Sequence, residues 1–287
     1  MIVIQPKTVS EQLLYTTVRI VGDTGTGTGF FFKYKLDGSK EIELILTNKH
    51  VVDGNNKLFF KFHEAQINSG ISEASSQSFD LDIDNIESFW IPHPEQDIDL
   101  GAILFAPIRQ HAKEIMQKDI FGIFFDDSLI KDDATLQLES DVSDEILMVG
   151  YPIGLWDDFN NFPIVRKGIT ATHPALDFKG KSLGVVDIAC FPGSSGSPIL
   201  IHMNAYQDKS GSYQLGTNKT ILLGLLTSGP YYTTTGQIEI REIPTSSVSF
   251  VSTNHMIHLG YYVKAREILS LCQDLKQKIN LETGKFY

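Results

Sequence analysis

Cysteine is scarce in this sequence, which has two of them, Cys190 and Cys272, among 287 residues. Two cysteines are too few for the disulfide framework that stabilises many small secreted proteins. Apolar runs of about 18 residues, which a membrane-spanning helix needs, are missing. The N-terminus also lacks a basic start followed by an apolar run and a small-residue cleavage site. We therefore expect a cytoplasmic protein with reduced thiols and no membrane contact.

Positive charge is in short supply as well. The chain has 24 lysines and arginines against 35 aspartates and glutamates, a formal net charge of −11, and its basic residues do not cluster. Such a surface repels phosphate backbones, so we expect no nucleic-acid partner. No two histidines stand four residues apart, and residues 25–29 lack the spacing of a dinucleotide or phosphate loop. We therefore expect no metal and no cofactor.

Short strand-like runs make up most of the chain. They recur about every 10 to 20 residues between turn signals, which is typical of β-barrels and sandwiches. Asp37-Gly38 joins two of these runs in a predicted hairpin. Apolar residues at steps of three and four over residues 263–279 predict an amphipathic terminal helix. Residues 63–88, 203–220 and 229–256 are rich in polar residues, and we expect loops there.

The segment from Phe191 to Pro198, with the sequence FPGSSGSP, carries the clearest chemical signal. Acyl transfer needs an exposed hydroxyl beside two backbone N–H groups that face the developing oxyanion. Glycines on both sides of a serine let the backbone turn tightly. Ser195 is the candidate nucleophile, and the N–H groups of Gly193 and Ser195 are the candidate oxyanion hole. A Gly/Ser/Pro turn without chemistry is the competing interpretation.

Two further segments supply partners for a serine nucleophile. His50 follows the apolar run ending at Thr47, and histidine is the usual general base near neutral pH. Asp99 opens the apolar run LGAIL, where a partly buried carboxylate can orient an imidazole. Asp97 competes with Asp99 for this role. The chain order His, Asp, Ser is the order of the chymotrypsin-type triad and differs from that of two other folds.

These motifs together resemble the trypsin-like serine peptidases. TNKHVV is similar to their histidine motif, DLGAIL to their aspartate strand, and GSSGSP to their serine motif. The Gly-rich start at residues 25–29 and the GYPIG sequence at residues 150–154 resemble the HtrA-like and bacterial trypsin-like branch. Asn48, Lys49 and Gly101 depart from the common motif residues without removing a reacting group. No PDZ-like segment follows, so HtrA-type oligomeric regulation is not implied.

The resemblance implies an all-β fold of two six-stranded antiparallel β-barrels with a C-terminal α-helix. We expect an N-terminal barrel over residues 1–120 that carries His50 and Asp99. A C-terminal barrel with the terminal helix, over residues 121–287, then carries Ser195. Asp99 is preferred to Asp97 because it gives the better strand register with residues 100–104.

The resemblance also implies a pocket for the substrate residue before the cleaved bond. It assigns substrate binding to Ala189, Thr227, Ser228, Gly229 and Gly260. Because no acid lies at the pocket base, we expect an apolar or small substrate residue there. His258 lies nearby in the sequence and would instead favour an acidic one.

Three functions are compatible with these residues. The first is a serine endopeptidase that acts on a protein or peptide substrate. The second is a non-catalytic trypsin-like module for binding or sensing, which the presence of all three triad residue types disfavours. The third is a protease held inactive until a regulatory protein partner arranges its loops, with residues 63–88 and 229–256 serving that control.

Overall fold

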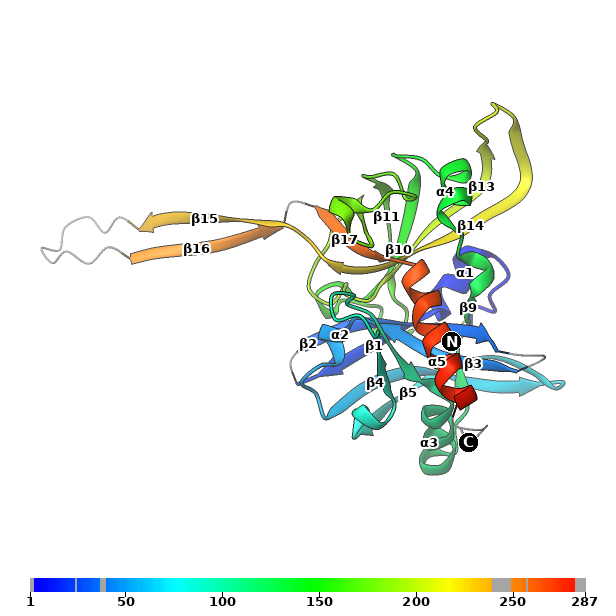
Figure 1. The fold of residues 1–287 in the computed structure, drawn as a ribbon. Helices are drawn as coiled ribbons and strands as arrows, with labels where there is room; N and C mark the ends of the chain where they lie inside the picture. The colour runs from blue at the N-terminus through cyan, green and yellow to red at the C-terminus, as the bar shows by residue number, and fades with distance from the viewer. Residues whose placement is uncertain (1–2, 24, 37–39, 239–248, 257, 282–287) are drawn as a thin grey trace, which may run out of the picture.

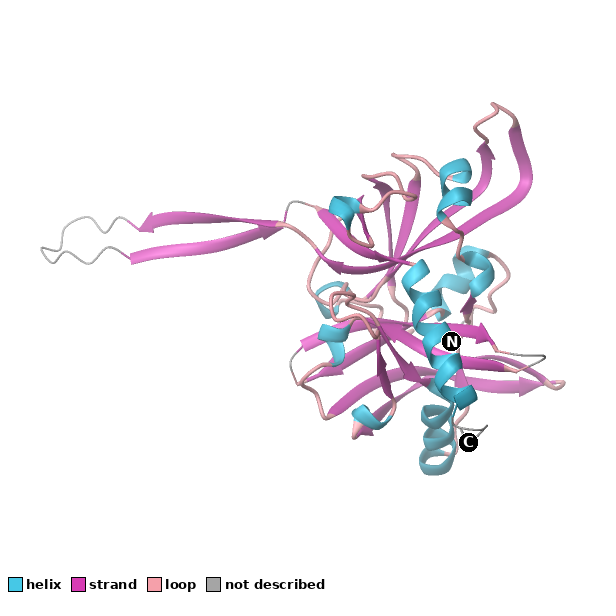
Figure 2. Cartoon of the chain, viewed as in Figure 1, coloured by secondary structure: helices cyan, strands magenta, loops and turns pink. Residues whose placement is uncertain are grey.

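The computed structural model describes residues 3–23, 25–36, 40–238, 249–256 and 258–281. Strands dominate both halves of the chain (Figure 2). The strands of the first half are β1 Thr17–Gly22, β2 Gly25–Lys35, β3 Glu41–Thr47, β4 Lys57–Asn68, β5 Ile71–Asp84, β6 Trp90–Pro92, β7 Gly101–Leu104, β8 Ile120–Phe121 and β9 Phe125–Asp126. Those of the second half are β10 Glu145–Gly150, β11 Ile164–Thr170, β12 Leu183–Asp187, β13 Pro198–Gln207, β14 Tyr213–Ser228, β15 Tyr231–Ile238, β16 Ser249–Met256 and β17 Leu259–Lys264. The helices are α1 Val9–Gln12, α2 Lys49–Val52, α3 Phe105–Met116, α4 Asp133–Glu139 and α5 Arg266–Leu281, with short 3-10 turns at Leu13–Tyr15, Ile86–Ser88, Asp127–Leu129, Pro152–Gly154 and Phe178–Gly180.

The predicted all-β class with a C-terminal helix is confirmed, and the two halves differ in detail. The second half forms a closed six-stranded barrel in the order β10-β11-β12-β17-β14-β13. Where we expected a second six-stranded barrel, the described strands of the first half form a nine-stranded sheet along the path β5-β4-β1-β2-β3-β7-β6. The additional strands β8 and β9 pair with β4 and β2, and β9 runs parallel to β2. They come from the segment that connects the two halves.

Two of the three expected loops are hairpins in the structure, so those predictions were wrong. Residues 63–88 lie largely in the long hairpin of β4 and β5, which turns at Ser69 and Gly70 with positive φ. Residues 203–220 belong to the hairpin of β13 and β14. Both segments are polar because their ends extend into solvent, and cross-strand pairing satisfies their backbone.

The third expected loop, residues 229–256, contains a separate two-stranded arm. Strands β15 and β16 pair with each other in register from Tyr231 with Met256 to Ile238 with Ser249. Figure 1 shows this arm projecting away from the barrel. Residues 239–248 of the expected loop lie outside the described residues. The arm leaves the barrel just after Ser228 and returns just before β17.

Helical structure inside the chain is a second departure from expectation. The apolar residues from Leu100 to Phe105 predict one strand, but β7 ends at Leu104 and α3 begins at Phe105. Phe105, Ile108 and Ala112 are buried on one face of α3, at the spacing of an amphipathic helix. Gln117 ends the helix in the left-handed conformation.

The core of the molecule extends through both halves. One hydrophobic cluster joins Phe30 and Leu44 of the first sheet to Leu200 and Leu225 of the barrel. Buried residues of α5 belong to the same cluster, and Figure 1 shows α5 running beside both halves. The terminal helix therefore shares one hydrophobic cluster with both halves.

Candidate active site

The imidazole of His50 is held by a carboxylate from a distant loop. His50 lies in α2, the single turn that follows β3, and Asp99 immediately precedes Leu100 and strand β7. The Nδ1 atom of His50 lies 2.7 Å from Oδ2 of Asp99. The backbone N–H of His50 donates to Oδ1 of the same carboxylate at 3.2 Å. This pairing fixes the ring and leaves Nε2 as the nitrogen that faces away from the carboxylate.

Asp99 is itself held from two sides. The side-chain amide of Asn48 donates to the carbonyl oxygen of Asp99 at 2.7 Å. The hydroxyl of Thr227, from the end of β14, donates to Oδ2 of Asp99. Burial pushes the pKa of Asp99 upward, but the hydrogen bonds from His50 and Thr227 outweigh it and leave that pKa below its usual value. Asp97, the competing candidate, is exposed and makes no hydrogen bond or ion pair with His50 among the described residues.

Ser195 follows a tight turn with the features of type II. The N–H of Ser194 donates to the carbonyl oxygen of Phe191 at 3.0 Å, and Gly193 has a φ of +87°. Pro192 and Gly193 are the residues that this turn prefers at its two central positions. The carbonyl oxygen of Pro192 accepts from the N–H of Ile153 at 2.6 Å. Because a peptide's N–H and carbonyl point in opposite directions, the N–H of Gly193 faces away from Ile153.

The two candidate oxyanion donors have no protein acceptor within the described part of the chain. Neither the N–H of Gly193 nor that of Ser195 makes a backbone or side-chain hydrogen bond there. Gly193 is buried, and Ser195 is partly exposed in a turn whose other members after Pro192 are buried. Two uncommitted N–H groups close together at a partly exposed serine are compatible with the needs of acyl transfer.

The turn of Ser195 is fastened to the strand next to His50. The N–H of Thr28, in β2, donates to the carbonyl oxygen of Ser195 at 2.8 Å, and its hydroxyl donates to that of Gly193 at 3.0 Å. The hydroxyl of Thr47 donates to the carbonyl oxygen of Thr28 at 2.8 Å. Thr47 lies three residues before His50. These bonds therefore connect the turn of Ser195, through Thr28 and Thr47, to the segment that carries the histidine.

The predicted substrate-binding residues lie on β14, β17 and the segment before Ser195. Gly260 pairs with Val186, and a Cβ at Gly260 would lie 2.6 Å from the sulfur of Cys190. Ala189 is partly buried and its carbonyl oxygen accepts from Arg166.

The other three predicted residues lie at the end of β14 or directly after it. Ser228 is exposed beside the partly exposed Gly229, and Thr227 contacts Asp99. His258 is exposed and its carbonyl oxygen accepts from the N–H of Ile188. Contact of these residues with substrate remains a prediction.

Sequence reasoning missed residues whose roles depend on long-range contacts. Thr227 was assigned to substrate binding alone, although its hydroxyl also holds Asp99. Asn48 was noted only as a departure from the common motif, and Thr28 and Arg166 were not singled out. The polar residues Thr28 and Asn48 next to apolar runs carry a faint signal, because a buried polar side chain needs a partner.

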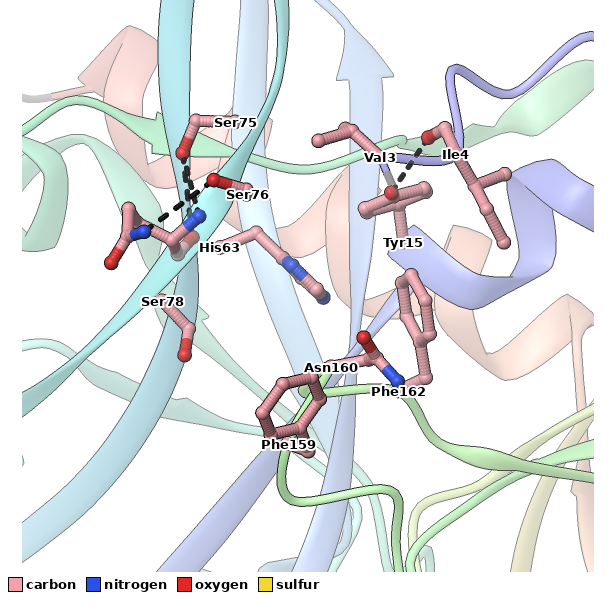
Figure 3. A pocket seen from close by; sticks show the side chains of 11 residues that line it. Val3, Ile4, Tyr15, His63, Ser75, Ser76, Ser78, Phe159, Asn160 and Phe162 are labelled. Carbon is pink, nitrogen blue, oxygen red and sulfur yellow. Dashed lines mark hydrogen bonds between the residues drawn. The ribbon is translucent and has the colours of Figure 1, made fainter. Parts of the chain in front are cut away.

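The described residues also contain a small cavity lined by other residues than those of this site. Figure 3 shows a small cavity of about 20 Å³ lined by residues that include Tyr15, His63 and Phe162. It has room for about one water molecule and none for a peptide side chain. No group of three or more potential metal ligands occurs in the described residues. Within the same residues, no helix is both long and apolar enough to cross a membrane.

The fold is mainly β, with a closed six-stranded barrel, a second sheet and a C-terminal helix, and solved structures with a chymotrypsin-like fold are similar to it. An inactive form of Rv3671c from M. tuberculosis is similar at 12% identity over 94% of this chain and 90% of that chain, with a TM-score of 0.44. A scabies mite inactivated protease paralogue is similar at 11% identity over 93% and 97% of the two chains, with a TM-score of 0.43. No protein-family model matches the sequence. A search of curated proteins gave no match either.

Proposed function

We propose that this protein is a serine endopeptidase that cleaves protein substrates through an acyl-enzyme. Ser195 is the nucleophile, His50 the general base and Asp99 the residue that orients the imidazole. The N–H groups of Gly193 and Ser195 form the oxyanion hole. These roles are similar to those of the trypsin-like peptidases that the sequence motifs resemble.

The observation that carries the proposal is the hydrogen-bond chain from Thr227 through Asp99 to His50. A carboxylate with a lowered pKa stays ionised at neutral pH and stabilises the imidazolium that forms when His50 takes a proton. It also selects the tautomer that carries its proton on Nδ1, so that Nε2 is free to accept. An exposed aspartate without these hydrogen bonds would neither orient the imidazole nor stabilise the imidazolium.

The proposed reaction proceeds in two steps. The hydroxyl of Ser195 attacks the substrate carbonyl while Nε2 of His50 takes its proton, and His50 then returns the proton to the leaving amine. Water attacks the acyl-enzyme in the second step with His50 again as base. One oxyanion-hole donor contributes about 10²- to 10³-fold to such a reaction.

The substrate side of the proposal is an extended peptide. The backbone from Thr227 to Gly229 pairs with it as an added strand, which fixes the register of its side chains. We propose an apolar or small residue before the cleaved bond, in a pocket bounded by Ala189 and Gly260. We also propose that the chain belongs to the HtrA-like and bacterial trypsin-like branch, which its sequence motifs resemble.

A cytoplasmic location and a regulatory protein partner are also part of the proposal. The location is supported by the two cysteines, which are free and buried. Burial raises the pKa of Cys190 to about 11 and that of Cys272 to about 12, so both thiols resist oxidation. The arm of β15 and β16 offers a surface for a partner close to the proposed substrate strand.

Labelling with a fluorophosphonate probe tests the proposal. We expect the wild type to be labelled, Ser195→Ala not to be labelled, and His50→Ala to be labelled far more slowly. Hydrolysis of a peptide library by the wild type then gives the preferred cleavage site. Absence of labelling under all conditions, in a folded protein, would point instead to a non-catalytic binding or sensing module.

A further inference from the structure

The guanidinium of Arg166, a residue of the barrel, hydrogen-bonds to the turn that carries Ser195. Arg166 lies in β11, where alternate residues face inward. Its Nη2 donates to the hydroxyl of Ser194 at 2.7 Å, and its Nη1 donates to the carbonyl oxygen of Ala189. Ser194 stands between the two candidate oxyanion donors. Ala189 belongs to the segment that we assign to the substrate pocket.

This guanidinium is a partly buried cation that has no anionic partner among the described residues. Its two acceptors are neutral oxygens, and no carboxylate pairs with it among the described residues. The Nε atom is buried and has no hydrogen-bond partner. Burial lowers the pKa of Arg166, as expected when a cation loses water without gaining an anion. A group of this kind costs stability, so its presence beside the proposed site calls for a functional explanation.

We propose that Arg166 is a positioning residue that holds the oxyanion turn and the pocket wall in one fixed arrangement. This inference rests on the proposed function. Fixing the side chain of Ser194 limits rotation of the peptide units on both of its sides. The unit after Ser194 carries the N–H of Ser195, and the unit before it is joined through Gly193 to the unit that carries the N–H of Gly193. Because an oxyanion hole works only when its donors are already aimed, a loss of this restraint slows acylation.

Other contacts on the same turn hold different atoms. Thr28 and Ile153 bind the carbonyl oxygens of Ser195, Gly193 and Pro192. Those bonds tie the turn to the first sheet and to the loop after β10. Arg166 alone among these residues contacts both the turn and Ala189, and charge-assisted hydrogen bonds are about twice as strong as neutral ones. It therefore couples the donors to the pocket.

The test compares Arg166→Met, Arg166→Lys and Ser194→Ala with the wild type. We expect Arg166→Met to lower the second-order rate of fluorophosphonate labelling by roughly 10- to 100-fold. In peptide hydrolysis, we expect kcat to change by a larger factor than KM, because the restraint stabilises the transition state more than the bound substrate. Ser194→Ala should lose less, and Arg166→Lys should recover part of the rate through one retained bond. Arg109→Met, which removes a surface arginine paired with Glu43, serves as the control.

Hydrogen exchange gives a readout that does not depend on turnover. Arg166→Met should raise amide exchange over residues 189–196 relative to the wild type and Arg109→Met, while the thermal midpoint does not fall, because the variant loses a cation that costs stability. Labelling and exchange that both match the wild type would overturn the positioning role and leave the proposed function intact. If the wild type itself is never labelled, the proposed function fails, and the exchange measurement alone decides whether Arg166 restrains the turn.

Discussion

At the level of single residues, the carboxylate of Asp99 is the point on which the site depends. It accepts from the ring of His50, from the backbone of His50 and from the hydroxyl of Thr227. Two of these donors belong to His50 and the third belongs to Thr227, which lies far along the chain. The carboxylate therefore has little freedom to turn. Such a fixed acceptor sets both the tautomer and the angle of the imidazole.

Replacing this carboxylate by an amide tests its role directly. Asp99→Asn keeps the shape but favours the wrong tautomer of His50, so we expect kcat to fall by about 10⁴-fold with little change in stability. Peptide hydrolysis and a thermal melt measure the two quantities. Asp97→Asn is the matched control and should keep full activity, because Asp97 is exposed and has no hydrogen bond or ion pair with His50 in the described part of the chain. Equal losses in the two variants would assign the orienting role elsewhere.

The conformation of the turn around Ser195 depends on Gly196. Gly196 has a φ of +85°, and a Cβ there would lie 2.0 Å from the carbonyl oxygen of Thr28. Gly196→Ala must therefore displace the turn from β2, and we expect fluorophosphonate labelling to slow by roughly 10²-fold. Gly211→Ala is a matched control, since Gly211 has a φ of +87° and its nearest neighbour would be 3.8 Å away.

Both variants carry the same backbone strain, and only Gly196→Ala adds the clash. Gly211→Ala should lose about 1–3 kcal/mol of local stability at the tip of its hairpin and keep its labelling rate. If the two variants are labelled equally fast, close approach of the turn to Thr28 is not needed for reactivity.

At the level of elements, the projecting arm is independent of the barrel from which it leaves. Strands β15 and β16 form a sheet of their own, with no strand of the barrel or of the first sheet paired to them in the described chain. An isolated two-stranded hairpin is marginally stable in water, so the arm adds little to the stability of the whole.

Deleting the arm tests this independence. Replacing residues 231–256 with Asn-Gly, a sequence that favours a tight hairpin turn, should change the thermal midpoint by no more than about 3 °C. Differential scanning calorimetry measures this shift, and far-ultraviolet circular dichroism checks that the barrel is retained. A fall of about 10 °C or more would show that the arm supports the barrel through β14 or β17.

The elements also show how much of the structure could be predicted from the sequence. Strand-like runs between turn signals predicted a β-barrel or sandwich class. Residue chemistry and chain order selected His50, Asp99 and Ser195, and the structure has the first two in hydrogen-bond contact. Residues 63–88 were misjudged because serine and acidic side chains indicate loops, although alternate residues Phe79, Leu81 and Ile83 are buried. The switch from β7 to α3 was missed because no polar residue separates them.

Contacts across the fold lay beyond sequence reasoning for a physical reason. Thr227 and Asp99 are 128 residues apart, and Arg166 and Ser194 are 28 apart. Nothing local in the sequence marks such pairs, because each partner would be equally stable facing water. Packing of the barrel against the first sheet brings Thr227 to Asp99, and closure of the barrel brings Arg166 to Ser194.

At the level of the whole molecule, His63 links the N-terminal segment to both halves. Its ring lies 4.7 Å from that of Tyr15 and 5.3 Å from that of Phe162, measured between centroids. Tyr15 in turn donates to the carbonyl oxygen of Ile4 at 2.7 Å (Figure 3). Nearby, the side chain of Asn161 donates to the carbonyl oxygen of Lys61 at 3.3 Å. Protonation of His63 would therefore place a charge where three parts of the chain meet.

This arrangement predicts a loss of stability in mild acid. Burial lowers the pKa of His63 to about 4, from 6.5 in the unfolded chain. Between these values the unfolded state binds the extra proton and the folded state does not, so the free energy of unfolding falls as the pH drops. At 1.36 kcal/mol per pKa unit, the loss from pH 7 to pH 4 is about 3 kcal/mol.

Denaturant unfolding at a series of pH values measures this dependence. His63→Phe keeps the ring contacts and cannot be protonated, so its unfolding free energy should fall by about 3 kcal/mol less than that of the wild type over the same range. His111→Phe makes the same change at an exposed position of α3 and should follow the wild-type curve. A curve for His63→Phe that parallels the wild type would mean that the ring of His63 already takes up a proton in the folded protein. The junction of the two halves would then tolerate a charge, and the acid sensitivity of the molecule would have to arise at other groups.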